Sequence, residues 1–201
     1  MSQKNLLEEQ EKEETAKELS FKEFIQQFKV SFKATKSMLL SLCWVFVVTF
    51  IVFNAAFVKA GFDFNKSDDE TQTQLLDQTT VNLIFNCLDT LGRYLGGKFI
   101  LSRRATIALS LLRTVFLFTT LATAVQMSPG WLFRADWFRL VNLILFSLSN
   151  GYVSTLCIII GPSLVKEKEQ QQQVGLFGSI FLCLGITIGS IINIPVGFVY
   201  N

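Results

Sequence analysis

The sequence contains no histidine, and this absence is the first limit on what the protein does. Because zinc sites are built largely from histidine and cysteine, we expect no metal site and no cofactor. The four cysteines, Cys43, Cys87, Cys157 and Cys183, all lie inside apolar runs, which argues against a disulfide framework. No nucleophile–base pair and no phosphate-binding loop is visible, so we do not expect an enzyme.

A signal peptide is also absent from the first twenty residues, which are mostly charged and polar. We therefore expect membrane insertion to begin at an internal helix. What the chain has instead is apolar residues: 50% of its 201 residues are hydrophobic, 20 are phenylalanine, and the mean hydropathy is +0.42. This composition predicts an all-α, polytopic membrane protein. Five apolar runs predict transmembrane helices at 38–58, 79–101, 105–126, 137–160 and 174–199.

The residues before the first predicted span divide into two parts. Residues 1–19 are rich in charge and read as a solvated tail. Residues 20–37 place aromatic and branched side chains at helical spacing between lysines: Phe21, Phe24, Ile25, Phe28 and Phe32 alternate with Lys22, Lys29, Lys33 and Lys36. This pattern predicts an amphipathic helix on an anionic membrane surface, with an ordinary packed helix or coiled-coil face as the alternative.

The second predicted span carries an acid and a base near its middle. Asp89 and Arg93 are four residues apart and share a helix face, which Asn82 and Asn86 extend. Each charge at the centre of a bilayer costs roughly 2.5 to 3.5 kcal/mol on insertion scales. The stripe is therefore expected to face a cavity or another helix. We interpret the pair as a functional site, and a structural ion pair that fixes one helix to another is the alternative.

The remaining spans contain isolated polar and small residues. Arg113 lies in the third span, where it either snorkels to the nearer surface or enters the bundle. Asn142 and Asn150 share one face of the fourth span, which either binds substrate or holds helices together by hydrogen bonds. Gly185 and Gly189 in the fifth span form a small-xxx-small pattern that favours close contact with a neighbouring helix.

Basic residues are distributed unevenly about the five spans. A cytosolic N-terminus would place most of them on the cytosolic side: Lys22, Lys29, Lys33, Lys36, Lys98, Arg103, Arg104, Lys166 and Lys168. The opposite side would hold Lys59, Lys66, Arg134 and Arg139. The positive-inside rule thus predicts a cytosolic N-terminus and an outward C-terminus, in the plasma membrane or an internal membrane. The sequon Asn65-Lys66-Ser67 in the first outward loop predicts glycosylation of Asn65.

Three motifs follow one another along the chain. They are Phe85-Asn86-x-x-Asp89-x-x-Gly92-Arg93, then Phe146-x-x-Ser149-Asn150-Gly151-Tyr152 with Ser154-Thr155-Leu156-Cys157 and Gly161-Pro162, and finally Phe181-Leu182-Cys183-Leu184-Gly185-x-x-x-Gly189. With this order and spacing, the stretch from about Lys29 to the end resembles helices seven to eleven of the equilibrative nucleoside transporter family. Arg113 also stands where that family carries an arginine in its ninth helix.

The resemblance implies half of a major-facilitator-like bundle and facilitated diffusion of nucleosides by alternating access. It implies that Asp89 and Arg93 bind the ribose hydroxyls, with Asn86 and Asn150 as further substrate-binding candidates. It also implies structural or gating roles for Arg113, Gly185 and Gly189. The expected partners are nucleosides or nucleobases, the lipid bilayer and a six-helix N-terminal half, and no nucleic acid is expected.

Two departures from the family pattern matter for function. Asn54 stands where the family commonly has proline, and the first six helices of the family have no counterpart here. We therefore interpret the chain as a C-terminal half that does not transport alone. Three alternatives stay open: a non-transporting structural or regulatory subunit, a proton-coupled nucleoside or nucleobase carrier, and an ion or proton conduction module that uses Asp89, Arg93 and Arg113.

Overall fold

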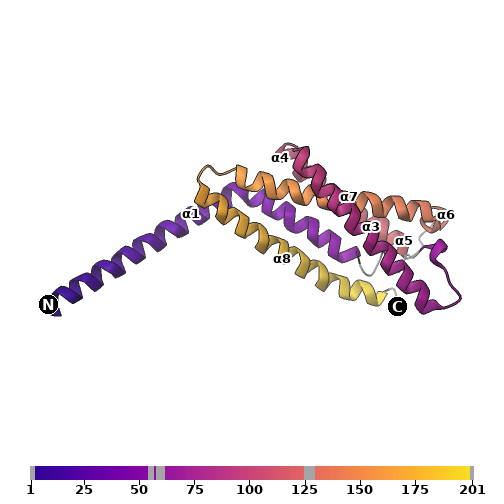
Figure 1. The fold of residues 1–201 in the computed structure, drawn as a ribbon, viewed down its shortest axis with the longest axis horizontal. Helices are drawn as coiled ribbons and strands as arrows, with labels where there is room; N and C mark the ends of the chain where they lie inside the picture. Colours follow the sequence, from indigo (N-terminus) through magenta and orange to yellow (C-terminus); the bar gives the residue numbers. More distant parts are fainter. Residues whose placement is uncertain (1–2, 54–56, 58–61, 125–129, 200–201) are drawn as a thin grey trace.

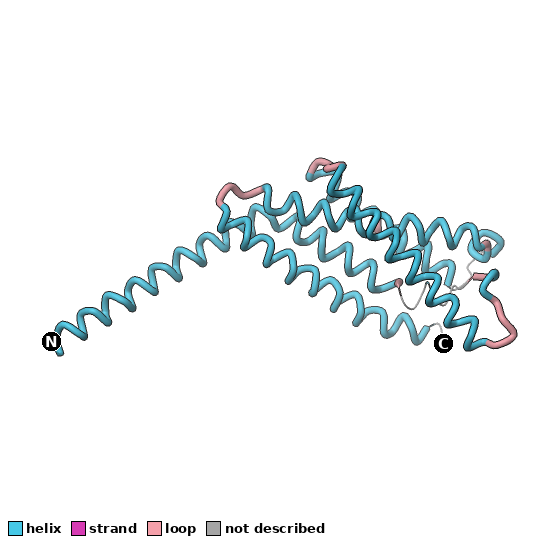
Figure 2. The backbone as a smooth tube through the Cα atoms, in the orientation of Figure 1, coloured by secondary structure: helices cyan, strands magenta, loops and turns pink. Residues whose placement is uncertain are grey.

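The computed structural model describes residues 3–53, 57, 62–124 and 130–199, and these residues form a bundle of helices without strands (Figure 1). The elements are α1 (Gln3–Val52), the short 3-10 helix η1 (Asp63–Asn65), α3 (Glu70–Lys98), α4 (Arg103–Leu112), α5 (Thr114–Ala124), α6 (Gly130–Arg134), α7 (Asp136–Ser163) and α8 (Lys168–Val199). Figure 2 shows the loops and turns of the described residues in pink. The predicted all-α architecture is confirmed.

Four helical stretches of the described chain are long and apolar enough to cross a membrane: Phe28–Val52, Arg103–Ala124, Asp136–Ser163 and Lys168–Pro195. They contain most of the first, third, fourth and fifth predicted spans. The second predicted span lies in α3, which is 29 residues long but too polar to belong to this set. Asn54 and the predicted span ends at 58 and 126 lie outside the described residues.

The charged tail, the amphipathic segment and the first span form one continuous helix, α1, of 50 residues. Figure 1 shows that the N-terminal portion of α1 extends away from the bundle and that the helix then changes direction to enter it. In the region where α1 joins the bundle, the buried Thr35 hydroxyl donates to the Ser31 carbonyl at 2.8 Å. Back-bonding of this kind often bends a helix.

The helix α3 begins earlier than predicted, because residues 59–78 were expected to form a loop and the helix already starts at Glu70. The reason is a side-chain cap: Oδ1 of Asp69 accepts a hydrogen bond from the Thr71 nitrogen at 2.9 Å. Such a bond satisfies one of the free N–H groups of a first helical turn. Residues 79–98 of the predicted span 79–101 thus form the C-terminal part of a longer helix, which ends at Lys98.

The third predicted span is interrupted at Arg113, where α4 ends and α5 begins after one residue. The Phe116 nitrogen bonds the Arg113 carbonyl at 3.0 Å, which is the tighter i to i+3 spacing of a 3-10 turn. The indole nitrogen of Trp44 donates to the Thr114 hydroxyl at 3.1 Å and so ties the first turn of α5 to α1. The break leaves the Arg113 side chain inside the bundle.

Helix α7 contacts both α3 and α1, and Figure 1 shows α3 crossing it. Its Phe146 is fully buried and packs against rings from three other parts of the chain, Phe57, Phe85 and Phe116. The most extensive helix contacts are those of α3 with α7 and of α1 with α8. These two pairs carry the residues discussed below.

The loop before α3 is fixed to the ends of two helices by carboxylates. Oδ1 of Asp77 accepts hydrogen bonds from the Phe62 nitrogen at 3.0 Å and from Nδ2 of Asn65 at 2.7 Å. Asp136, in the first turn of α7, accepts from the Asp63 nitrogen at 2.9 Å. The predicted glycosylation residue Asn65 is therefore half-buried, with its amide nitrogen also donating to Thr80 at 3.2 Å.

Candidate functional site

The acid and base singled out in the sequence are paired on α3. Nε of Arg93 lies 2.7 Å from Oδ2 of Asp89, as expected for side chains four residues apart on a helix. The two differ in exposure: the Asp89 side chain is 12% exposed and the Arg93 side chain is 48% exposed. The pair therefore sits at the boundary between the packed interior and an open face of the bundle.

The crossing of α3 and α7 places a second helix directly beside the pair. Gly151 of α7 lies against the Asp89 carbonyl, and a Cβ on Gly151 would lie 2.8 Å from the Arg93 nitrogen. Gly92 of α3 is packed in the same way, and its Cβ would lie 2.9 Å from the Tyr152 nitrogen. Because neither glycine has a side chain, the two main chains touch at this point. The residue before Gly151 is thereby brought to the carboxylate.

That residue is Asn150, which is 2% exposed and binds the acid directly. Its Nδ2 donates to Oδ1 of Asp89 at 2.7 Å. Its Oδ1 lies 2.7 Å from the Thr49 hydroxyl of α1 and accepts from Nη2 of Arg113 at 3.2 Å. The structure thus brings Asp89, Arg93 and Asn150 together, and adds Thr49 and Arg113 behind them.

Arg113 is buried, with 1% of its surface exposed, and points into the bundle instead of snorkelling. Its Nη1 donates to the Phe146 carbonyl at 2.9 Å and to the Ser149 hydroxyl, and its Nη2 donates to the Thr49 hydroxyl at 2.9 Å. The guanidinium carbon also lies 4.9 Å from the centre of the Phe146 ring. Within the described residues no carboxylate forms an ion pair with it, and oxygen acceptors and an aromatic face surround the charge instead.

Asn86 does not join this network. Its side chain is exposed and its Nδ2 donates to the Asn82 carbonyl of the same helix at 2.7 Å. Asn86, Thr90 and Arg93 together form an exposed polar flank of α3. Leu83, Leu91 and Tyr94 form a second exposed flank, which is largely apolar. Helix α3 therefore presents three sides: one packed on α7, one polar and one apolar.

Gly185 and Gly189 lie where α8 packs on α1. A Cβ on Gly185 would lie 2.9 Å from Cβ of Phe46, and a Cβ on Gly189 would lie 2.7 Å from the Val47 carbonyl oxygen. Both positions need glycine for the helices to approach this closely. They are remote from Asp89 and act on the packing of α8.

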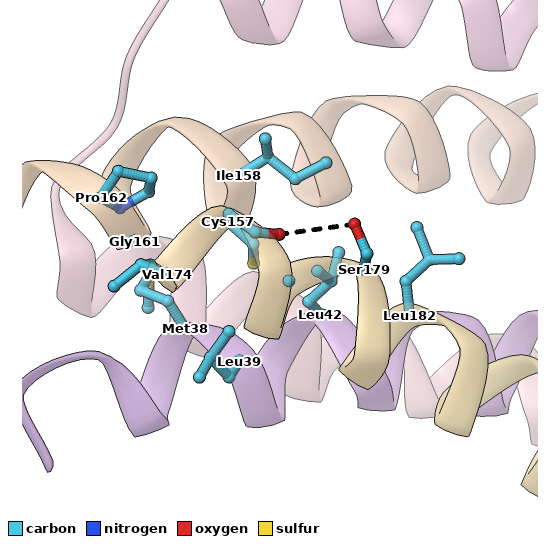
Figure 3. A pocket seen from close by; sticks show the side chains of 12 residues that line it. Met38, Leu39, Leu42, Cys157, Ile158, Gly161, Pro162, Val174, Ser179 and Leu182 are labelled. Carbon is cyan, nitrogen blue, oxygen red and sulfur yellow. Dashed lines mark hydrogen bonds between the residues drawn. The ribbon is translucent and has the colours of Figure 1, made fainter. Parts of the chain in front are cut away.

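A cavity of about 110 Å³ lies between α1, α7 and α8 and not at the acid and base (Figure 3). Its lining is mostly apolar, including Met38, Leu42, Cys157 and Val174. The Ser179 hydroxyl at its edge is bonded to its own helix, at the Gly175 carbonyl. At the candidate site, the half-exposed Arg93 side chain opens onto the surface of the described chain.

Sequence reasoning missed Thr49, which is buried in the network. A single threonine in an apolar run gives no local signal, because threonine in a helix commonly bonds its own backbone. The Val45 carbonyl lies 2.7 Å from the Thr49 hydroxyl and shares its single hydrogen with Oδ1 of Asn150. Its partner Asn150 is 101 residues away in the sequence. The sequence did indicate the polar face of the fourth predicted span, which Ser149 shares with Asn150, but it did not indicate which residue of another helix that face contacts.

Comparison with known proteins identifies relatives of this sequence. The family model described as "Nucleoside transporter" matches residues 1–196. The chain is similar to human equilibrative nucleoside transporter 1, at 28% identity over 158 residues, which is 76% of this chain and 34% of that protein. It is also similar to rat equilibrative nucleoside transporter 2, at 29% identity over 156 residues, 75% of this chain and 34% of the relative.

A more distant relative is adenosine transporter 1 of Crithidia fasciculata, at 25% identity over 170 residues, which cover 81% of this chain and 31% of that protein. The chain thus spans about a third of the length of the curated relatives it matches.

Proposed function

The chain belongs to the nucleoside transporter family, whose members are transporters and not enzymes, and we propose that it forms one wall of a nucleoside pathway through a membrane. The observation that carries this proposal is the position of the Asp89–Arg93 pair. It lies at the edge of an exposed polar flank, in a bundle whose other long helices are apolar. Charges placed in this way need an aqueous space or a second polar wall beside them.

In this proposal α3 also crosses the membrane, in addition to the four apolar stretches, although its own composition is too polar to indicate a transmembrane helix. Its 29 residues are long enough, since about 20 residues of helix span a hydrocarbon core. Its three sides suit three environments: α7 covers the packed side, the flank with Leu83, Leu91 and Tyr94 faces lipid, and the flank with Asn86 and Arg93 faces the pathway. The resulting five-helix unit, residues 38–201, is half of a major-facilitator-like bundle.

The chemistry at the pair fits a sugar diol. A ribose hydroxyl can donate to a carboxylate oxygen of Asp89 while a neighbouring hydroxyl accepts from a guanidinium N–H of Arg93. Among the described residues, Arg93 bonds Asp89 through Nε, which leaves Nη1 and Nη2 for a ligand. Charge-assisted hydrogen bonds of this kind contribute about 1.5 to 3 kcal/mol each. Asn86 lines the same flank as a weaker contact, and Asn150 supports Asp89 from behind.

The open face of the site is the reason to propose a partner. A six-helix N-terminal half would cover the polar flank of α3 and complete a cavity for nucleosides or nucleobases. In this arrangement the N-terminus is cytosolic and the C-terminus lies outside, following the basic residues counted above. Residues 20–37 would lie at the cytosolic membrane surface, with residues 1–19 extending beyond them. From Phe28 onward this segment already packs on α8, where the rings of Phe28 and Phe32 contact Phe177.

The decisive experiment is uptake of radiolabelled adenosine into liposomes. The chain is reconstituted alone, and in a second preparation it is fused behind the six N-terminal helices of human equilibrative nucleoside transporter 1. We expect uptake only in the second preparation, with no dependence on an imposed proton gradient. Uptake that requires the gradient would indicate the proton-coupled carrier instead.

The matched control is the same fusion with Asp89→Ala, at equal abundance in the liposomes. Uptake by this variant near that of the parent fusion would remove Asp89 from the site. A correctly inserted fusion that shows no uptake would indicate the structural or regulatory subunit. Conduction of ions or protons by the chain without nucleoside movement would indicate a conduction module.

A further inference from the structure

The Asn150 amide lies between two groups of opposite charge, and this fixes which way it points. An amide has an acceptor oxygen and a donor nitrogen, whereas a guanidinium only donates and an ionised carboxylate only accepts. Oδ1 of Asn150 must therefore face Arg113, at 3.2 Å from its Nη2, and Nδ2 must face Asp89, at 2.7 Å from its Oδ1. The reversed amide would oppose donor to donor and acceptor to acceptor.

From this geometry we propose that Thr49 and Arg113 are positioning residues for the nucleoside site, which they control through the Asn150 amide. The inference rests on the proposed function of Asp89 and Arg93. Thr49 is 2% exposed, and its hydroxyl lies 2.7 Å from Oδ1 of Asn150 and 2.9 Å from Nη2 of Arg113. Thr49 thus closes a triangle with the amide and the guanidinium.

The triangle is anchored independently of the substrate. Nη1 of Arg113 binds the Phe146 carbonyl at 2.9 Å, and the guanidinium lies over the Phe146 ring. Because Phe146 belongs to α7, one turn before Asn150, the guanidinium is held at a set distance from the amide. The consequence at the surface is specific: Oδ1 of Asp89 is held by Asn150, and Oδ2 is left to Arg93 and the ligand.

Two substitutions at position 49 separate the effect of the hydroxyl group from the effect of side-chain packing. Thr49→Val keeps the shape and removes the hydroxyl, whereas Thr49→Ser keeps the hydroxyl and removes a methyl group. The matched control is Thr35→Val, since Thr35 is also buried in α1 but its hydroxyl bonds only the backbone of its own helix in the described chain. The variants are made in the full chain joined to the six-helix half.

The measurement is the KM and maximal rate for adenosine and for 2′,3′-dideoxyadenosine, which lacks the 2′- and 3′-hydroxyls of the sugar. We expect Thr49→Val to raise the KM for adenosine about tenfold and to leave that for the dideoxy analogue within about twofold. Thr49→Ser and Thr35→Val should stay within about threefold of the parent for both substrates. Equal rises for both substrates, or a fall in maximal rate alone, would overturn the inference.

A second measurement decides the inference even if the parent fusion takes up no nucleoside, which would count against the proposed function alone. Melting temperatures of the chain in nanodiscs are compared for Thr49→Val, Asp89→Asn and the double variant. Thr49 and Asp89 are linked through Asn150, so we expect Thr49→Val to lower the melting temperature less when Asp89→Asn is present. Equal decreases in both backgrounds would show that the amide does not link them.

Discussion

Gly151 of α7 lies against the main-chain carbonyl of Asp89 in α3, one residue after the asparagine whose side chain binds the Asp89 carboxylate. The close approach of the α3 and α7 backbones and the hydrogen bond from Asn150 to Asp89 therefore depend on each other. A helix pair that could not come this close would leave Asn150 short of Asp89.

Substitution at the crossing should damage both packing and transport. Gly151→Ala places a methyl group against the α3 backbone, 2.8 Å from the Arg93 nitrogen, and should destabilise the chain by about 1 to 3 kcal/mol. Gly97→Ala is the control, because a Cβ there meets nothing within 4 Å. Thermal unfolding in nanodiscs measures both, and a melting temperature for Gly151→Ala as high as that of Gly97→Ala would contradict the packing argument.

The contact between α1 and α8 should be equally sensitive. Gly189→Ala brings a methyl group to 2.7 Å from the Val47 carbonyl oxygen, so α8 must shift outward at a cost of about 1 to 3 kcal/mol. Gly175→Ala, on the same helix with open space around it, serves as the comparison. Limited proteolysis of α8 should accelerate in the first variant and not in the second. Identical digestion rates would argue against close packing at Gly189.

A substitution at Arg93 can separate the geometry of the guanidinium group from its positive charge. Arg93→Lys keeps the positive charge but loses the planar fork, which can bind Asp89 through one nitrogen and a hydroxyl through another. We expect adenosine uptake by the fusion to fall at least tenfold, with normal abundance in the liposomes. The exposed Lys98 lies on the same helix, and Lys98→Arg should leave uptake within about twofold. Unchanged uptake by Arg93→Lys would mean that only the charge matters.

Arg113 is expected to matter for stability as well as position. Arg113→Met keeps much of the volume but removes the guanidinium donor from the Thr49 and Ser149 hydroxyls and one of the donors to the Phe146 carbonyl. The loss should be roughly 3 kcal/mol in the free energy of unfolding. For comparison, Arg103→Met removes an exposed arginine bonded to Ser37 and should cost less than about 1 kcal/mol. Similar losses in the two variants would be inconsistent with a special role for Arg113.

The orientation can be tested at the sequon. If the loop before α3 faces the lumen during synthesis, Asn65 should carry a glycan and the chain should shift in mass after treatment with a glycosidase. Ser67→Ala removes the sequon and leaves the bonds of Asn65 to Asp77 and Thr80 in place. A glycan on Nδ2 replaces one of the two N–H groups that make these bonds, so glycosylation should also loosen the loop. Absence of any shift would remove this support for an outward loop.

Local spacing was sufficient to predict the parts of the site that lie on one helix. Asp89 and Arg93 pair because residues four apart on a helix meet, a rule that needs no tertiary information. The small residues at 185 and 189 likewise pointed to a close helix contact before its partner, α1, was known. The sequence also indicated that the face of α7 with Asn150 is polar, but it did not indicate which residues Asn150 contacts.

Contacts between distant helices could not be derived in the same way. Thr49 reaches Asn150 across 101 residues, and no pattern within α1 distinguishes it from other threonines. Asn86 shares the stripe of Asp89 but turns to the exposed flank, since a stripe on a helix wheel is wider than one packing contact. The early start of α3 depends on a single cap at Asp69, which hydropathy does not register.

The glycine contacts also determine how this bundle can deform. Main chains that touch cannot slide past one another without breaking that contact, so α8 is carried along by α1, and α3 by α7, as two stiff units. The bond between Thr49 of α1 and Asn150 of α7 joins the two units to each other. In the proposed transporter, rocking that exposes a binding site first to one side of a membrane and then to the other would therefore take place between this half and the N-terminal half, and a sugar held at Asp89 would sit at the boundary of the two moving bodies.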